Sequence, residues 1–258
     1  MPIPWPLALI FDCADSLRHI QALSFAAMLF ESQYHIPSYG HFYENETDHR
    51  QSYVYVRELL QLRQHIMREA ALQDAAARPP SFAEQRTWVL KSPMHLESSN
   101  ALIHAFPEGF TLVRLHRDPY RVILSLATML AYIQALQSDR PKPRHVLEYW
   151  TGRIERMLRK AVADDGRLKS ADNVVVIDLS FDELMADPAG VAARCLQSAG
   201  LQVDAAVRAQ LAAYVKAHPR NATGAGRFSY SLEVFGSKLS EVEIRRRFDF
   251  YTQRFLSE

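Results

Sequence analysis

Two stretches of the chain place basic and imidazole side chains directly after short runs that are typical of strands. Lys91 and His95 follow the run 86–90, and Arg117 follows the run 110–115. A guanidinium can grip phosphate oxygens through two hydrogen bonds, a lysine can stabilise a negative leaving group, and an imidazole can accept a proton near neutral pH. These residue types therefore indicate chemistry on an anionic group.

The residues around Arg117 predict an anion site at the start of a helix. Asp118 can cap that helix, and Pro119 fits its first turn, where a missing N–H costs nothing. A helix N-terminus attracts anions, and an adjacent guanidinium adds to this attraction. Alternatives remain open: Arg117 pairs only with Asp118 or a neighbouring carboxylate, or His95 caps the next helix while Lys91 is a solvated charge.

Other chemical sites have less support in the sequence. One polar segment is crowded with imidazoles and carboxylates, namely His41, Glu44, Glu46, Asp48 and His49. No pair of them has a recognised metal-ligand spacing, so we expect no metal. The Gly224-Ala225-Gly226 stretch lacks the third glycine of a dinucleotide site, and the sequence contains neither GxSxG nor GxxxxGK[ST].

Composition and charge exclude several classes of protein. The 258 residues are 48% hydrophobic and 23% charged, which is ordinary for a globular domain. Thirty basic and 29 acidic residues leave a net charge of +1, so a strongly basic nucleic-acid binder is not expected. The two cysteines, Cys13 and Cys195, form no CxxC pair, which argues against a disulfide framework and favours a reducing cytoplasm.

No segment of the sequence is expected to span a membrane or to act as a signal peptide. The longest apolar stretch, 3–11, is about half the length of a spanning helix. It contains two prolines, and no Lys or Arg precedes it.

The periodicity of apolar residues predicts the elements that position the polar residues. Strands are predicted over 86–90, 110–115 and 173–179, and an exposed loop over 35–50. Helices are predicted over 16–31, 51–77, 95–106, 119–136, 145–163, 182–185, 188–199, 205–218 and 240–255. The last helix is expected to turn Val242, Ile244, Phe248, Tyr251 and Phe255 inward.

The alternation of strands and helices predicts an α/β fold with a parallel sheet covered on both faces. We expect one domain over residues 1–258, with a helical cap region at 1–80 and a nucleotide-binding core at 84–258. In such a sheet, ligands bind beyond the carboxyl ends of the strands, where Lys91 and Arg117 are predicted to lie.

The segment 88–130 resembles the core of bacterial sulfotransferases that use 3′-phosphoadenosine 5′-phosphosulfate (PAPS). It contains a Lys-Ser-Pro-x-His element, a His-Arg-Asp-Pro element and a serine eight positions beyond the arginine. The similarity continues through 180–188, the HPR element that ends at Arg220, the stretch 226–236 and the final FDFYTQRF. The resemblance implies a P-loop-type, three-layer parallel sheet flanked by helices.

The resemblance also implies a role for each matching residue. Arg117 and Ser125 match the pair that holds the 3′-phosphate, and Lys91 matches the lysine near the bridging oxygen of the sulfuryl group. His95 stands where a general base is expected, although the family's base varies. Phe181 replaces the aromatic residue, usually tyrosine, that packs on adenine. The loop that closes over the nucleotide would contain Arg220, Gly226 and Arg227.

The chain departs from this family at its start. The family opens with a strand and a Gly-x-Pro-Arg-Thr-Gly-Thr-Thr loop that binds the 5′-phosphosulfate, and this sequence contains neither. Without them, neighbouring strands have unpaired edges and the 5′ half of the nucleotide loses its anion cradle. We therefore expect either a start assigned too far downstream or a shortened relative with little or no activity.

The expected function is transfer of a sulfuryl group from PAPS to a hydroxyl or amine of a small-molecule acceptor, impaired by the missing loop. The alternative is a non-catalytic nucleotide-binding or interaction module that retains only the 3′-phosphate half-site. A phosphotransferase would need magnesium and a Walker lysine loop, which the sequence lacks. We expect a cytoplasmic protein without nucleic-acid partners, and a homodimer remains open.

Overall fold

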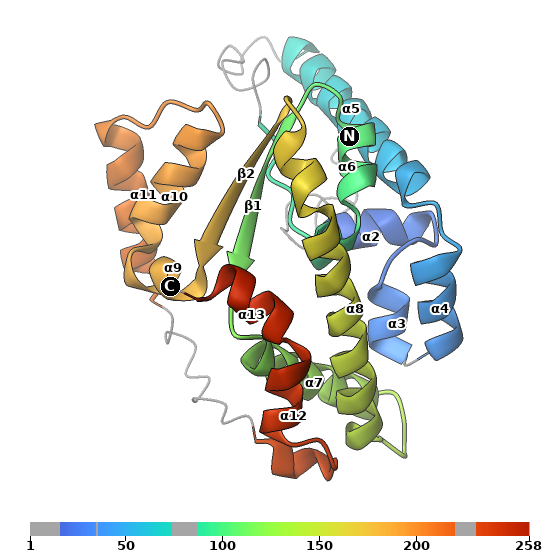
Figure 1. Cartoon of the computed structure of the whole chain (residues 1–258). Helices are drawn as coiled ribbons and strands as arrows, with labels where there is room; N and C mark the ends of the chain where they lie inside the picture. The colour runs from blue at the N-terminus through green and yellow to red at the C-terminus, as the bar shows by residue number, and fades with distance from the viewer. Residues whose placement is uncertain (1–15, 35, 74–86, 220–230, 258) are drawn as a thin grey trace. The chain divides into compact units, whose positions relative to one another are not determined.

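The computed structural model describes residues 16–34, 36–73, 87–219 and 231–257 (Figure 1). The chain forms two compact units, Met1–Pro107 and Glu108–Glu258, and each unit is described by itself. The expected division into a cap at 1–80 and a core at 84–258 stays a prediction.

The described part of the first unit is helical. Its elements are α2 (Ser16–Leu23), α3 (Leu29–Tyr34), α4 (Pro37–Asn45), α5 (His49–Gln73), the 3₁₀ helix η1 (Pro93–Glu97) and α6 (Ser99–Ala105). The predicted helix 51–77 corresponds to α5, and its expected end lies outside the described residues. The predicted helix 95–106 is divided between η1 and α6.

The helix and the loop expected over 16–50 in the first unit are wrong predictions. The helix expected over 16–31 is interrupted between α2 and α3, where Phe25 adopts a φ of 56° that a right-handed helix excludes. The loop expected over 35–50 contains α4 instead, and Tyr39 and Tyr43 on that helix are buried. Burial of two aromatic side chains outweighs the weak helix propensity of this segment.

The strand predicted over 86–90 is also a wrong prediction, because its described part, 87–90, forms no strand. A strand requires a neighbour that accepts its backbone hydrogen bonds, and no described segment pairs with this one. Trp88 and Leu90 are partly buried and pack instead against a cluster of helix side chains, Ile20, Val56 and Leu60.

The second unit contains a parallel pair of strands, as predicted. Strand β1 (Phe110–His116) pairs with β2 (Val174–Ser180), in a register that runs from Phe110 opposite Val174 to His116 opposite Ser180. One face of the pair carries Arg114 and Asp178, and α8 (Pro143–Ser170) packs against β2. The opposite face leaves Val113, Leu115 and Val175 between 44 and 46% exposed.

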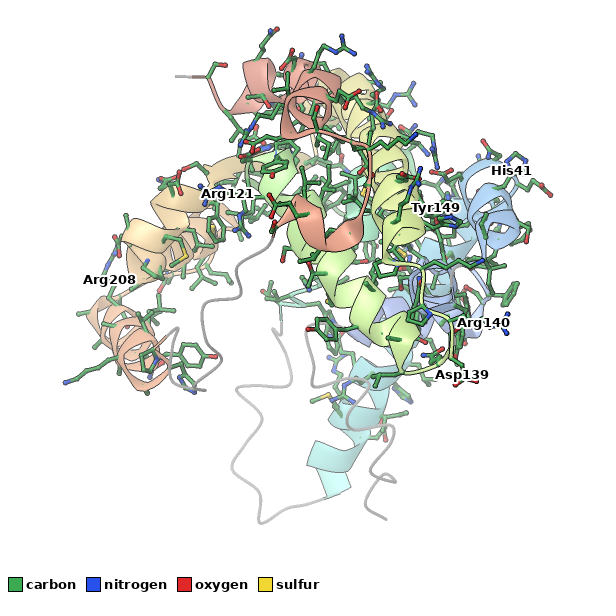
Figure 2. The ribbon with its side chains drawn as sticks, turned by 90° about the horizontal axis from the view of Figure 1, so that it is seen from below. His41, Arg121, Asp139, Arg140, Tyr149 and Arg208 are labelled. Atoms are coloured by element: carbon green, nitrogen blue, oxygen red, sulfur yellow. The ribbon has the colours of Figure 1, made fainter. Side chains whose placement is uncertain are left out.

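In the second unit, α7 (Pro119–Ala135) and α8 come between the two strands along the chain, and the other helices follow β2. These are α9 (Phe181–Ala186), α10 (Pro188–Ser198), α11 (Ala205–Ala217), the 3₁₀ helix η2 (Leu232–Phe235), α12 (Glu241–Arg247) and α13 (Asp249–Phe255). Helices α7 and α8 pack side by side and bury Ile123 and Trp150 completely. The connection between them carries the exposed Asp139 and Arg140 (Figure 2).

The C-terminal segment consists of two short helices rather than the single helix predicted over 240–255. A capping box between Ser240 and Glu243 starts α12, and the chain turns at Phe248 before α13. Ile244, Phe248 and Tyr251 are buried as expected, but Val242 is 75% exposed, because it stands two residues from Ile244 and therefore on the opposite side of α12. No described helix is long and apolar enough to cross a membrane.

Candidate functional site

Arg117 and Phe181 meet at the carboxyl end of the parallel strands. His116 and Ser180, the last residues of β1 and β2, are register partners, so the residues that follow them emerge at the same edge of the sheet. The guanidinium carbon of Arg117 lies 4.3 Å from the centre of the Phe181 ring, within the range of a cation–π contact. Both side chains are partly buried. This edge is where parallel sheets bind their ligands.

Asp118 is engaged by groups other than Arg117. Its Oδ1 accepts the backbone N–H of Tyr120 at 3.0 Å and so caps α7, while its Oδ2 accepts a hydrogen bond from Arg245 at 3.0 Å. Within the described segments, no carboxylate pairs with Arg117. The alternative in which Arg117 pairs with Asp118 is therefore wrong, and the guanidinium stands beside a helix N-terminus with its charge uncompensated by these residues.

Ser125 lies on α7 and is partly buried. With a rise of 1.5 Å per residue, it stands roughly 9 Å along the helix axis from Pro119, the first residue of α7. Its predicted contact with the same phosphate as Arg117 stays a prediction.

Lys91 and His95 belong to the first unit, at the start of η1. The hydroxyl of Ser92 accepts the N–H of Met94 at 3.3 Å, so Ser92 caps η1 and the alternative role of His95 as a cap is wrong. Lys91 precedes this cap and is exposed. His95 is partly buried, and its Nδ1 lies 2.8 Å from the hydroxyl oxygen of Tyr53.

The environment of His95 keeps its ring neutral. Burial lowers the pKa of His95 from 6.5 to about 4, and burial also raises the pKa of Tyr53, which therefore keeps its proton. A neutral imidazole can accept a proton, but a pKa this low makes it a weak base at neutral pH. The structure thus supports the protonation state that a general base needs while reducing its strength.

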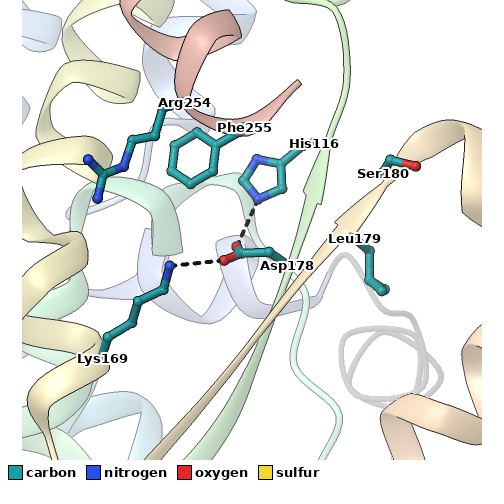
Figure 3. A pocket seen from close by; sticks show the side chains of 7 residues that line it. All are labelled: His116, Lys169, Asp178, Leu179, Ser180, Arg254 and Phe255. Carbon is teal, nitrogen blue, oxygen red and sulfur yellow. Dashed lines mark hydrogen bonds and ion pairs between the residues drawn. The ribbon is translucent and has the colours of Figure 1, made fainter. Parts of the chain in front are cut away.

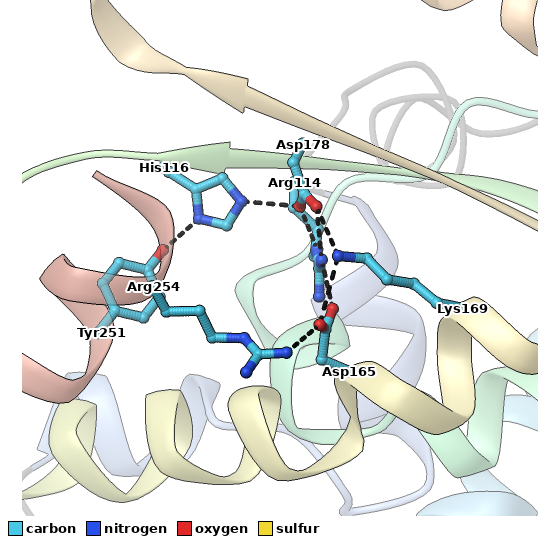
Figure 4. A network of polar contacts seen from close by, with 7 residues as sticks. All are labelled: Arg114, His116, Asp165, Lys169, Asp178, Tyr251 and Arg254. Atoms are coloured by element: carbon cyan, nitrogen blue, oxygen red, sulfur yellow. Dashed lines mark hydrogen bonds and ion pairs between the residues drawn. The ribbon is translucent and has the colours of Figure 1, made fainter. Parts of the chain in front are cut away.

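A buried ionic network lies under the strand ends, and sequence analysis missed it (Figure 4). Arg114, only 4% exposed, donates to both carboxylate oxygens of Asp178, at 2.7 and 2.9 Å, and to Asp165 on α8 at 2.6 Å. Arg254 on α13 donates to the other oxygen of Asp165 at 2.6 Å. Lys169 lies 3.3 Å from Asp165 and 3.2 Å from Asp178.

The sequence does contain a signal for this network. Arg114 and Asp178 are each the only charged residue of a predicted strand, and they are register partners in the sheet. Opposite charges inside two neighbouring strands indicate an ion pair between those strands.

The electrostatics of the two carboxyl groups follow from these contacts. Burial raises the pKa of Asp178, but hydrogen bonds from Arg114 and His116 outweigh it and hold that pKa well below its ordinary value. The pKa of Asp165 is also lowered, because hydrogen bonds from Arg254 and Arg114 outweigh the effect of burial. Both side chains are therefore charged at neutral pH.

An open cavity of about 400 Å³ adjoins the network at the strand ends (Figure 3). Its lining consists of His116, Lys169, Asp178, Leu179, Ser180, Arg254 and Phe255. Solvent therefore reaches the ion pairs around Asp178 from this side.

The remaining predicted residues, Arg220, Gly226 and Arg227, lie outside the described part of the chain. Within the described part, no group of three or more His, Cys, Asp and Glu side chains is placed to hold a metal ion.

Comparison with known proteins identifies the family. The model of the sulfotransferase family matches residues 9–205. The chain belongs to the sulfotransferase family. This confirms the resemblance inferred from the segment 88–130 and the α/β fold with a parallel sheet. No curated protein matches the chain.

Two solved sulfotransferases share the fold. The match to sulfotransferase STF9 from Mycobacterium avium has a TM-score of 0.72 at 22% identity and covers 93% of this chain and 56% of that one. The match to sulfotransferase STF1 from Mycobacterium tuberculosis H37Rv has a TM-score of 0.64 at 23% identity and covers 90% and 53%. This sulfotransferase-family chain thus spans about half the length of the structures that it matches.

Proposed function

We propose that the chain binds PAPS and transfers its sulfuryl group to a hydroxyl or amine of a small-molecule acceptor. The observation that carries the proposal is the contact between Arg117 and Phe181 at the carboxyl end of the parallel strands. The resemblance gives these two residues to the 3′-phosphate and to adenine. Because the 3′-phosphate and the adenine belong to one nucleotide, the residues that bind them must lie close together.

The residues present at this edge fit a nucleotide. The guanidinium of Arg117 lies over the Phe181 ring, and the resemblance gives this ring to adenine, on which an aromatic side chain can stack. The start of α7, a helix of 17 residues, adds partial positive charge next to Arg117. Ser125 on the same helix is the proposed second ligand of the 3′-phosphate.

The proposed transfer forms a bond from the acceptor oxygen or nitrogen to sulfur as the bond from sulfur to the bridging oxygen breaks. His95 takes the acceptor proton, and Lys91 stabilises the negative charge on the departing bridging oxygen. Arg220, Gly226 and Arg227 are proposed to close over the nucleotide. Sulfuryl transfer, like phosphoryl transfer, depends mainly on positioning and charge neutralisation, which these residue types supply.

A second candidate is a nucleotide-binding module that does not transfer sulfate. The observation that favours it is that burial lowers the pKa of His95 to about 4, which makes the proposed general base weak at neutral pH. Such a module would keep the 3′-phosphate half-site at Arg117. The cytoplasmic location and the homodimer stay predictions under both candidates.

Calorimetric titration with 3′-phosphoadenosine 5′-phosphate (PAP) tests the nucleotide site. We expect micromolar binding by the purified chain and roughly ten- to a hundredfold weaker binding by Arg117→Ala, since hydrogen bonds to a charged group contribute about 1.5–3 kcal/mol. The matched control is Arg121→Ala, which removes an exposed arginine from the first turn of α7 (Figure 2).

The outcomes separate the candidates. Failure of the folded chain to bind PAP, or equal losses in the Arg117 and Arg121 variants, contradicts the nucleotide site. Binding of PAP together with transfer of labelled sulfate from PAPS supports the sulfotransferase. Binding without transfer to any acceptor favours the second candidate.

A further inference from the structure

The imidazole of His116, the residue directly before Arg117, is held on three sides. Its Nδ1 lies 2.7 Å from the hydroxyl oxygen of Tyr251, and its Nε2 lies 2.8 Å from Oδ1 of Asp178 (Figure 4). The ring of Phe255 stacks on it, with centres 4.3 Å apart and planes 10° from parallel. Only 4% of His116 is exposed, so its ring has a single position.

These contacts select one tautomer of the ring. Burial raises the pKa of Tyr251 to about 12, so its hydroxyl keeps its proton and donates it to Nδ1. Burial also lowers the pKa of His116, so the ring is neutral at pH 7 and its remaining proton is on Nε2. That N–H donates to the carboxylate of Asp178, and every polar atom of the ring is satisfied.

The same contacts attach α13 to the strand ends. Tyr251 and Arg254 lie one turn apart on α13, and Arg254 donates to Asp165 on α8 at 2.6 Å. Through His116 and Asp178, Tyr251 is linked to the carboxyl-terminal ends of both β1 and β2. A displacement of α13 therefore moves His116, and with it the next residue along the chain.

We propose that Tyr251 is a positioning residue for the anion site: through His116 it fixes the end of β1 and so places the guanidinium of Arg117 over Phe181. This inference rests on the proposed function, in which Arg117 holds the 3′-phosphate. Tyr251 acts on Arg117 indirectly, through the residue before it, because Tyr251 contacts His116 whereas Arg117 contacts Phe181. Tyr251 itself need not touch the nucleotide.

The variant Tyr251→Phe tests the inference by removing one hydroxyl. Titrations with PAP and with adenosine 5′-phosphate, which lacks the 3′-phosphate, are compared. We expect PAP to bind about tenfold more weakly and adenosine 5′-phosphate to bind unchanged, because only the contact with Arg117 is displaced. In the double variant, adding Tyr251→Phe to Arg117→Ala should not weaken PAP binding further. The control is Tyr132→Phe, which alters a tyrosine on α7 that is 67% exposed.

A spectroscopic readout separates positioning from general loss of structure. The ¹⁵N resonances of the His116 ring should report the Nε2–H tautomer in the wild-type chain and a changed Nδ1 resonance in Tyr251→Phe. Thermal unfolding is measured for each variant. If Tyr251→Phe does not fold, Arg254→Gln replaces it, because that half-exposed side chain also attaches α13 and should cause the same selective loss of PAP binding.

The results distinguish the two levels of inference. Loss of PAP binding in Arg117→Ala with no change in Tyr251→Phe, or equal weakening of both nucleotides in Tyr251→Phe, overturns the role of Tyr251 alone. Absence of PAP binding by the wild-type chain overturns the proposed function and this role with it.

Discussion

Replacement of Asp165 by alanine is expected to lower the free energy of unfolding of the second unit by about 3–5 kcal/mol. The side chain is almost wholly buried and accepts hydrogen bonds from Arg114 and Arg254, both at 2.6 Å. Its loss leaves Asp178 as the remaining carboxylate partner of the buried Arg114 guanidinium among the described residues. Removal of one member of a buried ionic network is costly because the remaining charge cannot regain its hydration.

Denaturant unfolding followed by circular dichroism measures this effect. The control is Asp139→Ala, which removes an exposed carboxylate from the connection between α7 and α8 and should change the free energy by less than about 0.5 kcal/mol. Comparable losses in the two variants, or a loss below about 1 kcal/mol for Asp165→Ala, would show that the network does not stabilise the unit.

Acid should weaken the same network. The pKa values of Asp165 and Asp178 are lower in the folded chain than their ordinary value of 3.8. Groups of this kind contribute stability that is fully present above their unfolded pKa and is lost as the pH falls below it. The difference between wild type and Asp165→Ala should therefore shrink as the pH is lowered through about 4.

The two strands, and the position of Arg117 and Phe181 directly after them, could be predicted because their signals are local. Apolar runs rich in β-branched residues mark β1 and β2, and Asp118 followed by Pro119 marks the start of α7. The adjacency of Arg117 and Phe181 then follows from the rule that parallel strands end at one edge of a sheet.

The errors arose where distant parts of the chain determine the local structure. Helix α4 is rich in aromatic and turn-forming residues, and it is helical because Tyr39 and Tyr43 pack against Ala27 and Met94 from elsewhere in the unit. The strand predicted over 86–90 had the right composition but has no described neighbour with which to pair. Neither the packing of α4 nor the lack of a described pairing partner for 86–90 can be predicted from the local sequence alone.

The ionic network shows a third kind of limit. Asp165 lies in the last turns of α8, beyond the predicted end of that helix at residue 163, and its polar surroundings in the sequence indicate an exposed residue. It is buried because α13 brings Arg254 over it and β1 brings Arg114 under it. Pairing of this kind depends on the packing of three elements, so only a folded structure reveals it.

Lowering the pH from about 6.5 to about 4 is expected to reduce the unfolding free energy of the first unit by about 3 kcal/mol through His95 alone. The pKa of this group is about 4 in the folded chain and 6.5 in its ordinary surroundings. The unfolded chain therefore binds the proton more tightly across this range. The contribution of His95 is fully present above pH 6.5 and is lost as the pH falls toward 4.

Variants of His95 and Tyr53 test this cause. Because burial lowers the pKa, His95→Leu should flatten the pH dependence, whereas Tyr53→Phe should retain it, since that variant removes the hydroxyl that contacts His95 but leaves the ring of His95 buried. An NMR titration of the His95 ring gives its pKa directly, and a midpoint near 6.5 would contradict the prediction. A midpoint near 4 has a consequence for catalysis: if His95 is the general base, the acid limb of kcat/KM should also lie near pH 4.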